Sequence, residues 1–484
     1  MKGTKTSGDS VAKSMIYKTL ERYAVMAFQM IVQIVIARLL SPSDYGVISM
    51  MIVFIAIATI FVQNGFSQAL VQKKEVSEID YSTTFILNLM IGVLLYVVLL
   101  FSTPYIAEYY HEEQIKQCLP VMSLLLIFGS INSTQIAIAN RQMRFKKLFY
   151  CNVWASILSG IAGIVMAVLG FGVWALVTQQ LSNSIVLSVT IWLHQRWFPK
   201  TGFSRTNAKE LFSFGWKLLV AGLLNQTYKE LTSLIIGRKY TSSDLAFYTK
   251  GSQFPKYITM GVDSSINSVM YAAFSKNQNN KAALYQQMKN SMVINTYIVF
   301  PLLALLALMA TPLVHILLTD KWLPVVPYMQ ICCFTFALHP IASVQVQAIT
   351  AVGRSDIRLK IEILKKTIGV FLICLALPYG SFAIAISVAI AGIIGVLIGA
   401  IAGSMTTGYK FINIFRDLVP TTLATLAMMM PVYFLGKLNE SPLIILAIQG
   451  SVGAVIYIAL SAIFKLYGYN YLVNYLISNK KVKK

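Results

Sequence analysis

The stretch from Ser381 to Ser404 reads SFAIAISVAIAGIIGVLIGAIAGS and contains no charged side chain. A helix needs about 20 predominantly apolar residues to cross a hydrocarbon core roughly 30 Å thick, so this stretch predicts a membrane span. Similar runs recur along the 484 residues, of which 57% are hydrophobic and 12% charged. Because a typical soluble domain is about 45–50% apolar and about 25% charged, a water-soluble fold is excluded.

These runs predict an all-α polytopic membrane protein with about fourteen transmembrane helices. The predicted spans are residues 18–37, 45–70, 82–107, 117–139, 148–169, 172–193, 212–236, 246–273, 290–312, 324–351, 361–378, 381–404, 418–436 and 442–465.

The charges in the connecting loops predict the orientation. One connection holds Arg141, Arg144, Lys146 and Lys147, whereas a connection on the opposite face holds Glu108, Glu112 and Glu113. Cytoplasmic loops of membrane proteins carry an excess of Lys and Arg, so we expect both termini in the cytoplasm. The excess of 40 Lys and Arg over 18 Asp and Glu therefore needs no nucleic-acid partner.

An internal repeat divides the chain. Ile36, Arg38, Ser43 and Asp44 recur at a constant offset as Ile236, Arg238, Ser243 and Asp244. The repeat predicts an N-lobe of six spans (1–193), a cytoplasmic linker (194–210), a C-lobe of six spans (211–404), and two further spans with a basic tail (405–484). Parallel repeats are a transporter architecture with the substrate site near the midplane, at the interface between halves.

Five cations fall inside or at the margins of the predicted spans, all in the first, seventh and eighth: Arg22, Lys217, Lys229, Lys250 and Lys256. A charge within the membrane costs about 2.5 kcal/mol or more and normally faces a water-filled cavity or a partner. The acids of these spans are Glu21, Glu230 and Asp263. The positive excess predicts a cavity for an anion, and a pyrophosphate suits it.

Each of these charges also has a structural interpretation. Arg22 lies near the cytoplasmic end of its helix and can extend to the headgroups. Lys229, beside Glu230, and Lys250 can be interfacial or part of an ion pair. Lys217, Lys256 and Asp263 are therefore the strongest candidates. Transporter carboxylates often bind coupling ions, so Asp263 and Glu21 are candidates for coupling to a proton or sodium gradient.

Amides of the same spans are candidates for contacts with sugar hydroxyls. The candidate cavity lining is Gln33, Asn64, Gln68, Asn225 and Asn267. The alternative for each is an interhelical hydrogen bond worth about 0.6 kcal/mol.

Enzyme and metal signatures are missing from the sequence. There is no GxxxxGK[ST] phosphate loop and no HExxH motif, the four histidines are scattered, and no cysteine pair has CxxC spacing. We expect a protein that is not an enzyme and that needs no metal or other cofactor.

Several motifs carry a family resemblance. ARLLSPSDYG (37–46) is followed by NGF (64–66) and ALVQK (69–73), and FGVWA (171–175), SFG (213–215) and IGR (236–238) come later. This series resembles bacterial polysaccharide and O-antigen flippases of the Wzx type, in the multidrug, oligosaccharidyl-lipid and polysaccharide exporter superfamily, and is most similar to colanic acid and exopolysaccharide exporters.

The resemblance implies a two-lobed helical bundle in the bacterial inner membrane. Such a protein moves an undecaprenyl-pyrophosphate-linked repeat unit between leaflets by alternating access, with membrane lipids around it and polysaccharide polymerase machinery as an expected partner. Arg22, Lys217 and Lys256 look similar in role to the family's cavity cations, by location and not by a strict motif.

Three other functions stay open at this point. A multidrug and cation antiporter of the same superfamily would favour an acidic cavity, against the positive excess here. A membrane polysaccharide polymerase would need a large catalytic loop, and no connection here exceeds about twenty residues. A non-transporting scaffold would tolerate neutralisation of the cavity charges.

Overall fold

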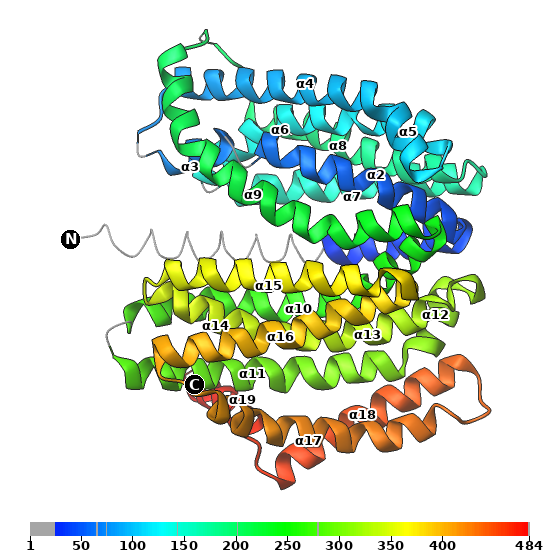
Figure 1. The fold of residues 1–484 in the computed structure, drawn as a ribbon, viewed down its shortest axis with the longest axis vertical. Coiled ribbons are helices and arrows are strands. Elements are labelled where there is room, and N and C mark those ends of the chain that lie inside the picture. The colour runs from blue at the N-terminus through cyan, green and yellow to red at the C-terminus, as the bar shows by residue number, and fades with distance from the viewer. Residues whose placement is uncertain are drawn as a thin grey trace. The chain divides into compact units, whose positions relative to one another are not determined.

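A computed structural model describes residues 25–63, 66–73, 75–142, 144–200, 202–277 and 280–482. Every regular element in these ranges is a helix (Figure 1). The chain divides into two compact units, one ending at Ala246 and the other running from Phe247 to Lys484.

The first unit begins with a helix over Val25–Leu39. It continues with α2 (Pro42–Gln63), α3 (Phe66–Gln72), α4 (Glu78–Tyr110), α5 (Gln114–Met122), α6 (Leu124–Arg141), α7 (Phe145–Val168), α8 (Val173–Gln195) and α9 (Arg205–Lys239).

The first residues of α10 (Ser242–Lys276) complete the first unit, and its remainder opens the second. The second unit continues with α11 (Lys281–Leu308), α12 (Ala310–Leu318), α13 (Val325–Ala337), α14 (His339–Ala351), α15 (Ser355–Ala376), α16 (Ser381–Thr407), α17 (Phe411–Leu435), α18 (Pro442–Ile463) and α19 (Tyr467–Val482), and with short 3-10 turns at Asp320–Trp322 and Leu377–Tyr379.

The prediction of an all-α polytopic membrane protein is confirmed. Within the described residues, ten stretches of helix are long and apolar enough to cross a membrane. The other four predicted spans coincide with Val25–Leu39, α9, α10 and α15. α9 and α10 are 35 residues each and carry the charges that lower their hydropathy.

Two predicted spans are built from two helices each. The span predicted at 117–139 divides at Ser123 into α5 and α6, and that at 324–351 divides at Leu338 into α13 and α14. Pro340 lies in the first turn of α14, where its missing N–H needs no partner. The break places His339 at the start of a new helix in the middle of a membrane span.

The repeat predicted from the sequence recurs in the local geometry. Asp44 Oδ2 accepts hydrogen bonds from the backbone N and Oγ of Ser41 at 2.9 and 2.6 Å. Asp244 Oδ2 accepts the same pair from Thr241, at 3.2 and 2.7 Å. Each cap satisfies free donors where one long helix ends and the next begins. The predicted division into lobes at residues 193 and 211 stays a prediction. The contacts within the chain group α9 with the first unit.

Each unit has its own core. In the first, Gly160 and Gly163 of α7 face the Val25–Leu39 helix closely, because an added Cβ would lie 2.6 Å from Val32 Cγ2 and 3.0 Å from Ile36 Cδ1, respectively. In the second, α11 is central: Met288 and Met292 pack with Tyr409, and Tyr297 packs with Tyr457 of α18.

Candidate functional site

One ridge of α9 carries the predicted polar residues of the seventh span. Lys217, Ala221, Asn225 and Lys229 follow one another at intervals of four residues, and all are exposed. Residues four apart form one inclined ridge on an α-helix. At about 1.5 Å per residue, the two lysines lie about 18 Å apart along the axis. The structure therefore brings two of the predicted cations onto one exposed face of one helix, which we call the α9 ridge.

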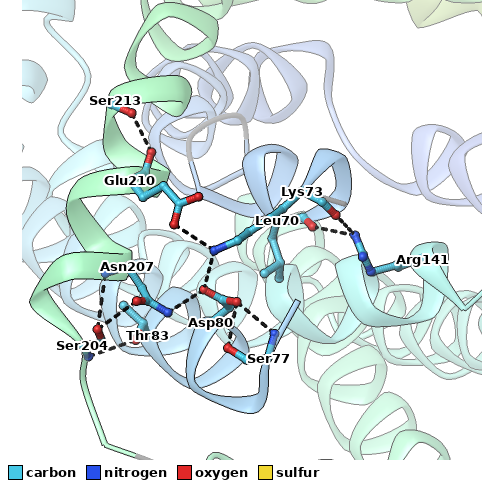
Figure 2. Close-up of polar contacts among 10 residues, drawn as sticks. All are labelled: Leu70, Lys73, Ser77, Asp80, Thr83, Arg141, Ser204, Asn207, Glu210 and Ser213. Atoms are coloured by element: carbon cyan, nitrogen blue, oxygen red, sulfur yellow. Dashed lines mark hydrogen bonds and ion pairs between the residues drawn. The ribbon is translucent and has the colours of Figure 1, made fainter. Parts of the chain in front are cut away.

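The first residues of α9 are fixed by a polar network around Asp80 (Figure 2). Lys73 Nζ lies 3.1 Å from Asp80 Oδ1 and 2.9 Å from Glu210 Oε2. Asn207 Nδ2 donates to the same Asp80 oxygen at 2.7 Å. Because Asn207 and Glu210 belong to α9, these contacts hold the start of that helix against α3 and α4. The Glu210 carboxylate, together with Asp80, raises the pKa of the Lys73 ammonium, so Lys73 stays charged.

Asp80 is almost fully enclosed in this network, with 2% of its side chain exposed. Its second oxygen accepts from the backbone N and the Oγ of Ser77, both at 2.9 Å, which caps α4. Ser204 caps α9 by accepting from Asn207 N at 3.3 Å, and its own N donates to Thr83 Oγ1 at 3.1 Å. A buried carboxylate is tolerated when it is paired and hydrogen-bonded in this way.

The same network reaches α6 through Arg141. The guanidinium donates to the Leu70 carbonyl oxygen at 3.3 Å and also to the carbonyl oxygen of Lys73. The sequence predicts that Arg141 lies in a cytoplasmic loop. In the structure its guanidinium hydrogen-bonds carbonyl oxygens at the end of α3.

The last residues of α9 are fixed by close packing. Ile36 and Ile236 are fully buried, and an added Cβ on Gly237 would lie 3.0 Å from the Tyr110 ring. The Arg238 guanidinium lies 4.8 Å from the centre of the Tyr109 ring. α9 is therefore held at both ends within the first unit, and the α9 ridge lies exposed between the two attachments.

α10 places its two predicted cations in different surroundings. Lys256 is exposed, whereas only 7% of Lys250 is exposed. Next to Lys250, α10 packs closely on α13, because an added Cβ on Gly251 would lie 2.9 Å from the backbone N of Met329. A ligand-binding role for these two lysines stays a prediction.

Asp263 has specific partners on two other helices of the second unit. Its Oδ1 accepts a hydrogen bond of 2.6 Å from Asn295 Nδ2 of α11. Its Oδ2 lies 2.5 Å from His339 Nδ1 of α14. The Asp263 side chain is 6% exposed and that of His339 54% exposed. The three residues form a polar group, the Asp263 cluster, that is buried on the carboxylate side and open on the imidazole side.

The predicted polar lining is partly engaged within the protein. Gln33 Nε2 donates to Gln179 Oε1 of α8 at 3.1 Å, which fits its alternative interpretation as an interhelical contact. Asn225 lies on the α9 ridge and is exposed. The remaining predicted site residues lie outside the described residues or side chains: Glu21, Arg22, Asn64, Gln68 and Asn267.

The Asp263 cluster shows what sequence reasoning missed. In the sequence, His339 is one of four scattered histidines, and no motif marks Asn295. The available signal was a histidine in the middle of an apolar span, which is expensive unless it has a polar partner. The partner was not readable, because Asp263 and His339 are separated by 76 residues.

Comparison with known proteins identifies the family. Residues 35–327 match the model of a family described as polysaccharide biosynthesis protein. The chain belongs to this family. The predicted resemblance to polysaccharide exporters is therefore confirmed at the level of the family.

Relatives of this polysaccharide biosynthesis protein include teichuronic acid biosynthesis protein TuaB of Bacillus subtilis (strain 168), which is 25% identical over 305 residues, 62% of each chain. Lipopolysaccharide biosynthesis protein WzxC of Escherichia coli (strain K12) is 22% identical over 371 residues, 75% of this chain and 72% of WzxC. The chain thus matches less than two thirds of the length of TuaB.

A solved structure with the same fold is the lipid II flippase MurJ in an inward closed conformation. It matches with a TM-score of 0.76 and 16% identity, covering 95% of this chain and 100% of MurJ. At this identity the likeness establishes the fold and leaves the substrate open.

Proposed function

We propose that this protein is a flippase that moves undecaprenyl-pyrophosphate-linked oligosaccharide repeat units across the bacterial inner membrane by alternating access. The observation that carries the proposal is the exposed α9 ridge with Lys217 and Lys229, in a member of a polysaccharide biosynthesis family. The names of TuaB and WzxC place those relatives in envelope glycan synthesis, and MurJ, of the same fold, is named as a flippase of a lipid-linked precursor.

The charge balance of α9 and α10 favours an anionic substrate. Lys217, Lys229 and Lys256 are exposed. The two nearby acids are engaged: Glu230 accepts from Gln226 at 2.8 Å, and Asp263 is buried with its two partners. Lysines at membrane depth normally face water and not lipid, and their ammonium groups bind phosphate as point charges. A cationic drug would meet uncompensated positive charge, which argues against the multidrug antiporter.

The proposal assigns the remaining predicted residues as follows. Arg22, Lys217, Lys229, Lys250 and Lys256 are the candidate substrate-binding cations, and Gln33, Asn64, Gln68, Asn225 and Asn267 are the candidate polar lining. Asp263 and Glu21 are the carboxylates for ion coupling. Both termini lie in the cytoplasm, and a polysaccharide polymerase receives the repeat unit on the outer side.

The test measures glycan export and lipid-linked intermediates in cells that lack the protein. The cells are complemented with the wild type, with Lys217→Ala, Lys229→Ala or Lys256→Ala, and with Lys116→Ala as a control at matched expression. Lys116 pairs with Glu113 at 3.0 Å on an exposed helix turn of α5 and is not a residue of the α9 ridge. We expect the intermediates to accumulate on the cytoplasmic side in the null strain and in the three lysine variants, and export to be normal in the control.

The outcomes separate the alternatives. Full rescue by all three lysine variants would remove the anion site and favour a scaffold. Export of single repeat units without elongation in the null strain would indicate a polymerase. No change of glycan in the null strain would overturn the flippase proposal.

A further inference from the structure

The Asp263 cluster lies where a membrane protein rarely places ionisable groups. His339 follows the break between α13 and α14, in the middle of the span Val325–Ala351. Asn295 is near the middle of α11 and is fully buried. Carboxylate and imidazole groups at this depth are characteristic of ion pathways and proton relays. The cluster therefore needs an explanation beyond packing.

The contacts fit a proton better than a metal ion. Both Asp263 oxygens face hydrogen-bonding nitrogens, at 2.6 Å from Asn295 Nδ2 and 2.5 Å from His339 Nδ1. A metal ion would need several oxygen or nitrogen ligands aimed at one point, and the described residues contain no group of three His, Cys, Asp or Glu side chains suited to that. A proton needs only the carboxylate itself.

Asn295 can hydrogen-bond both charge states of Asp263. Its Nδ2 now donates to the carboxylate, while its Oδ1 is buried without a hydrogen-bond partner. An amide carries two donors and an acceptor in one group. When Asp263 takes up a proton and becomes a donor, a half-turn of the amide offers it the unused Oδ1. The orphaned oxygen is thus the acceptor that the protonated state requires.

His339 supplies a route for the proton. Its side chain is 54% exposed, whereas that of Asp263 is 6% exposed, so the ring is the open side of the cluster. A proton that binds Nε2 leaves an imidazolium, which passes its Nδ1 proton to Asp263 Oδ2 and becomes the neutral Nε2–H tautomer. A half-turn of the carboxyl group then brings the O–H to Asn295 and its unprotonated oxygen to the bare Nδ1, which has no proton to donate. One proton enters and one is transferred, and no electrons move. Histidine suits this role because its charge changes in the physiological pH range.

The helices around the cluster carry further charged side chains of both signs. On α10, Lys256 lies two turns before Asp263 and is exposed. On α11, Lys289 is paired with Asp417 at 2.8 Å. α15 carries Asp356, which pairs with Arg354 at 3.0 Å, and Glu362. Its Lys365 side chain lies along α16, with Cε 3.4 Å from an ideal Cβ on Gly395. α13 and α16 carry no charged side chain, and α14 carries only His339. Among the acids of these helices, Asp263 is the one in contact with a histidine, whereas Asp417 is paired with Lys289.

We propose that Asp263 and His339 form a proton-binding pair, with Asn295 as its positioning residue, that links proton uptake to the contact between α10 and α14. Protonation neutralises the carboxylate that holds His339, so α14 is released from α10, and deprotonation restores the contact. The role of this pair in transport rests on the proposed flippase function. The proton-binding site itself does not.

The first experiment measures proton binding without any substrate. The purified full chain in nanodiscs of phosphatidylethanolamine and phosphatidylglycerol is titrated from alkaline to acidic pH by infrared difference spectroscopy. We expect a carboxylic acid carbonyl band to grow in the wild type, to be lost in Asp263→Asn, and to shift its midpoint in His339→Gln. Asp417→Asn is the matched control, because Asp417 is held by Lys289. An unchanged band in Asp263→Asn would overturn the proposal.

Folding of the variants is checked by size-exclusion chromatography and thermal unfolding. Should Asp263→Asn fail to fold, His339→Gln carries the test, and an unshifted midpoint in that variant overturns the proposal.

The second experiment separates this inference from the proposed function. Export is measured in null cells complemented with wild type, Asp263→Asn or Asp417→Asn, with a protonophore or with sodium replaced by potassium. We expect export to be lost with the protonophore and in Asp263→Asn, and to survive sodium replacement. Wild-type export by Asp263→Asn, or dependence on sodium, would overturn proton coupling and leave the flippase standing. Normal export in null cells would overturn the flippase, and the infrared titration would still decide the proton site.

Discussion

Gly46 of α2 lies against the backbone of Ser242, so that a Cβ on Gly46 would stand 1.9 Å from the Ser242 carbonyl oxygen. Real Cβ atoms do not approach a backbone oxygen so closely. The backbone of Ser242 at the start of α10 is packed and cannot move away as a flexible side chain can, so only glycine fits at position 46. This contact joins the two positions where the internal repeat begins a new helix.

Gly46→Ala is therefore expected to destabilise the protein by about 1–3 kcal/mol, the usual cost of overpacking. Gly129→Ala is the control, because nothing lies within 4 Å of a Cβ at that helical position. Thermal unfolding in detergent, followed by size-exclusion chromatography, compares the two. Equal melting temperatures would show that α2 and the start of α10 are not in this contact.

Removal of the Asp80 carboxylate is expected to loosen the start of α9. Asp80→Ala leaves Lys73 and Asn207 without their shared acceptor and removes the cap of α4, so we expect a loss of about 3 kcal/mol, as for a broken buried pair. Limited proteolysis near residue 205 and the melting temperature measure the effect. Glu113→Ala, which removes an exposed pair, should cost about 0–1 kcal/mol. A similar small loss in Asp80→Ala would contradict the role of the network.

The sign of the charge on the α9 ridge is expected to control export. Lys217→Arg keeps the positive charge and should export nearly as the wild type, whereas Lys217→Glu places a negative charge where an anion binds and should abolish export. The change should not alter the melting temperature, because Lys217 is exposed. Rates of glycan export at matched protein levels decide the point. Equal export by the two variants would mean that the ridge does not contact the anion.

The two equivalent helix caps are expected to contribute equally to stability. Asp44→Ala and Asp244→Ala each remove an acceptor for two donors, and loss of a cap costs typically about 1 kcal/mol. The melting temperatures of the single and double variants measure the contributions. A lower melting temperature in only one of the two single variants would show that the two caps contribute unequally to stability.

The sequence by itself determined the membrane spans, the repeat and the family resemblance. These depend on local composition: an apolar run such as residues 381–404 must form its own backbone hydrogen bonds in lipid, and a helix is how a chain does so. The position of a residue along a predicted span gives its depth in the membrane. The sequence alone therefore showed that Lys217, Lys229 and Asp263 are charges placed at a free-energy cost.

Only the tertiary structure decided how these residues are partnered. The burial of Lys250, the enclosure of Asp80 by Lys73 and Asn207, and the pairing of Asp263 with His339 join helices far apart in the chain. A hydropathy pattern records which residues enter the membrane but not which faces of which helices meet. Contacts between distant segments follow from the packing of side chains in three dimensions, so they appear only when the helices are placed.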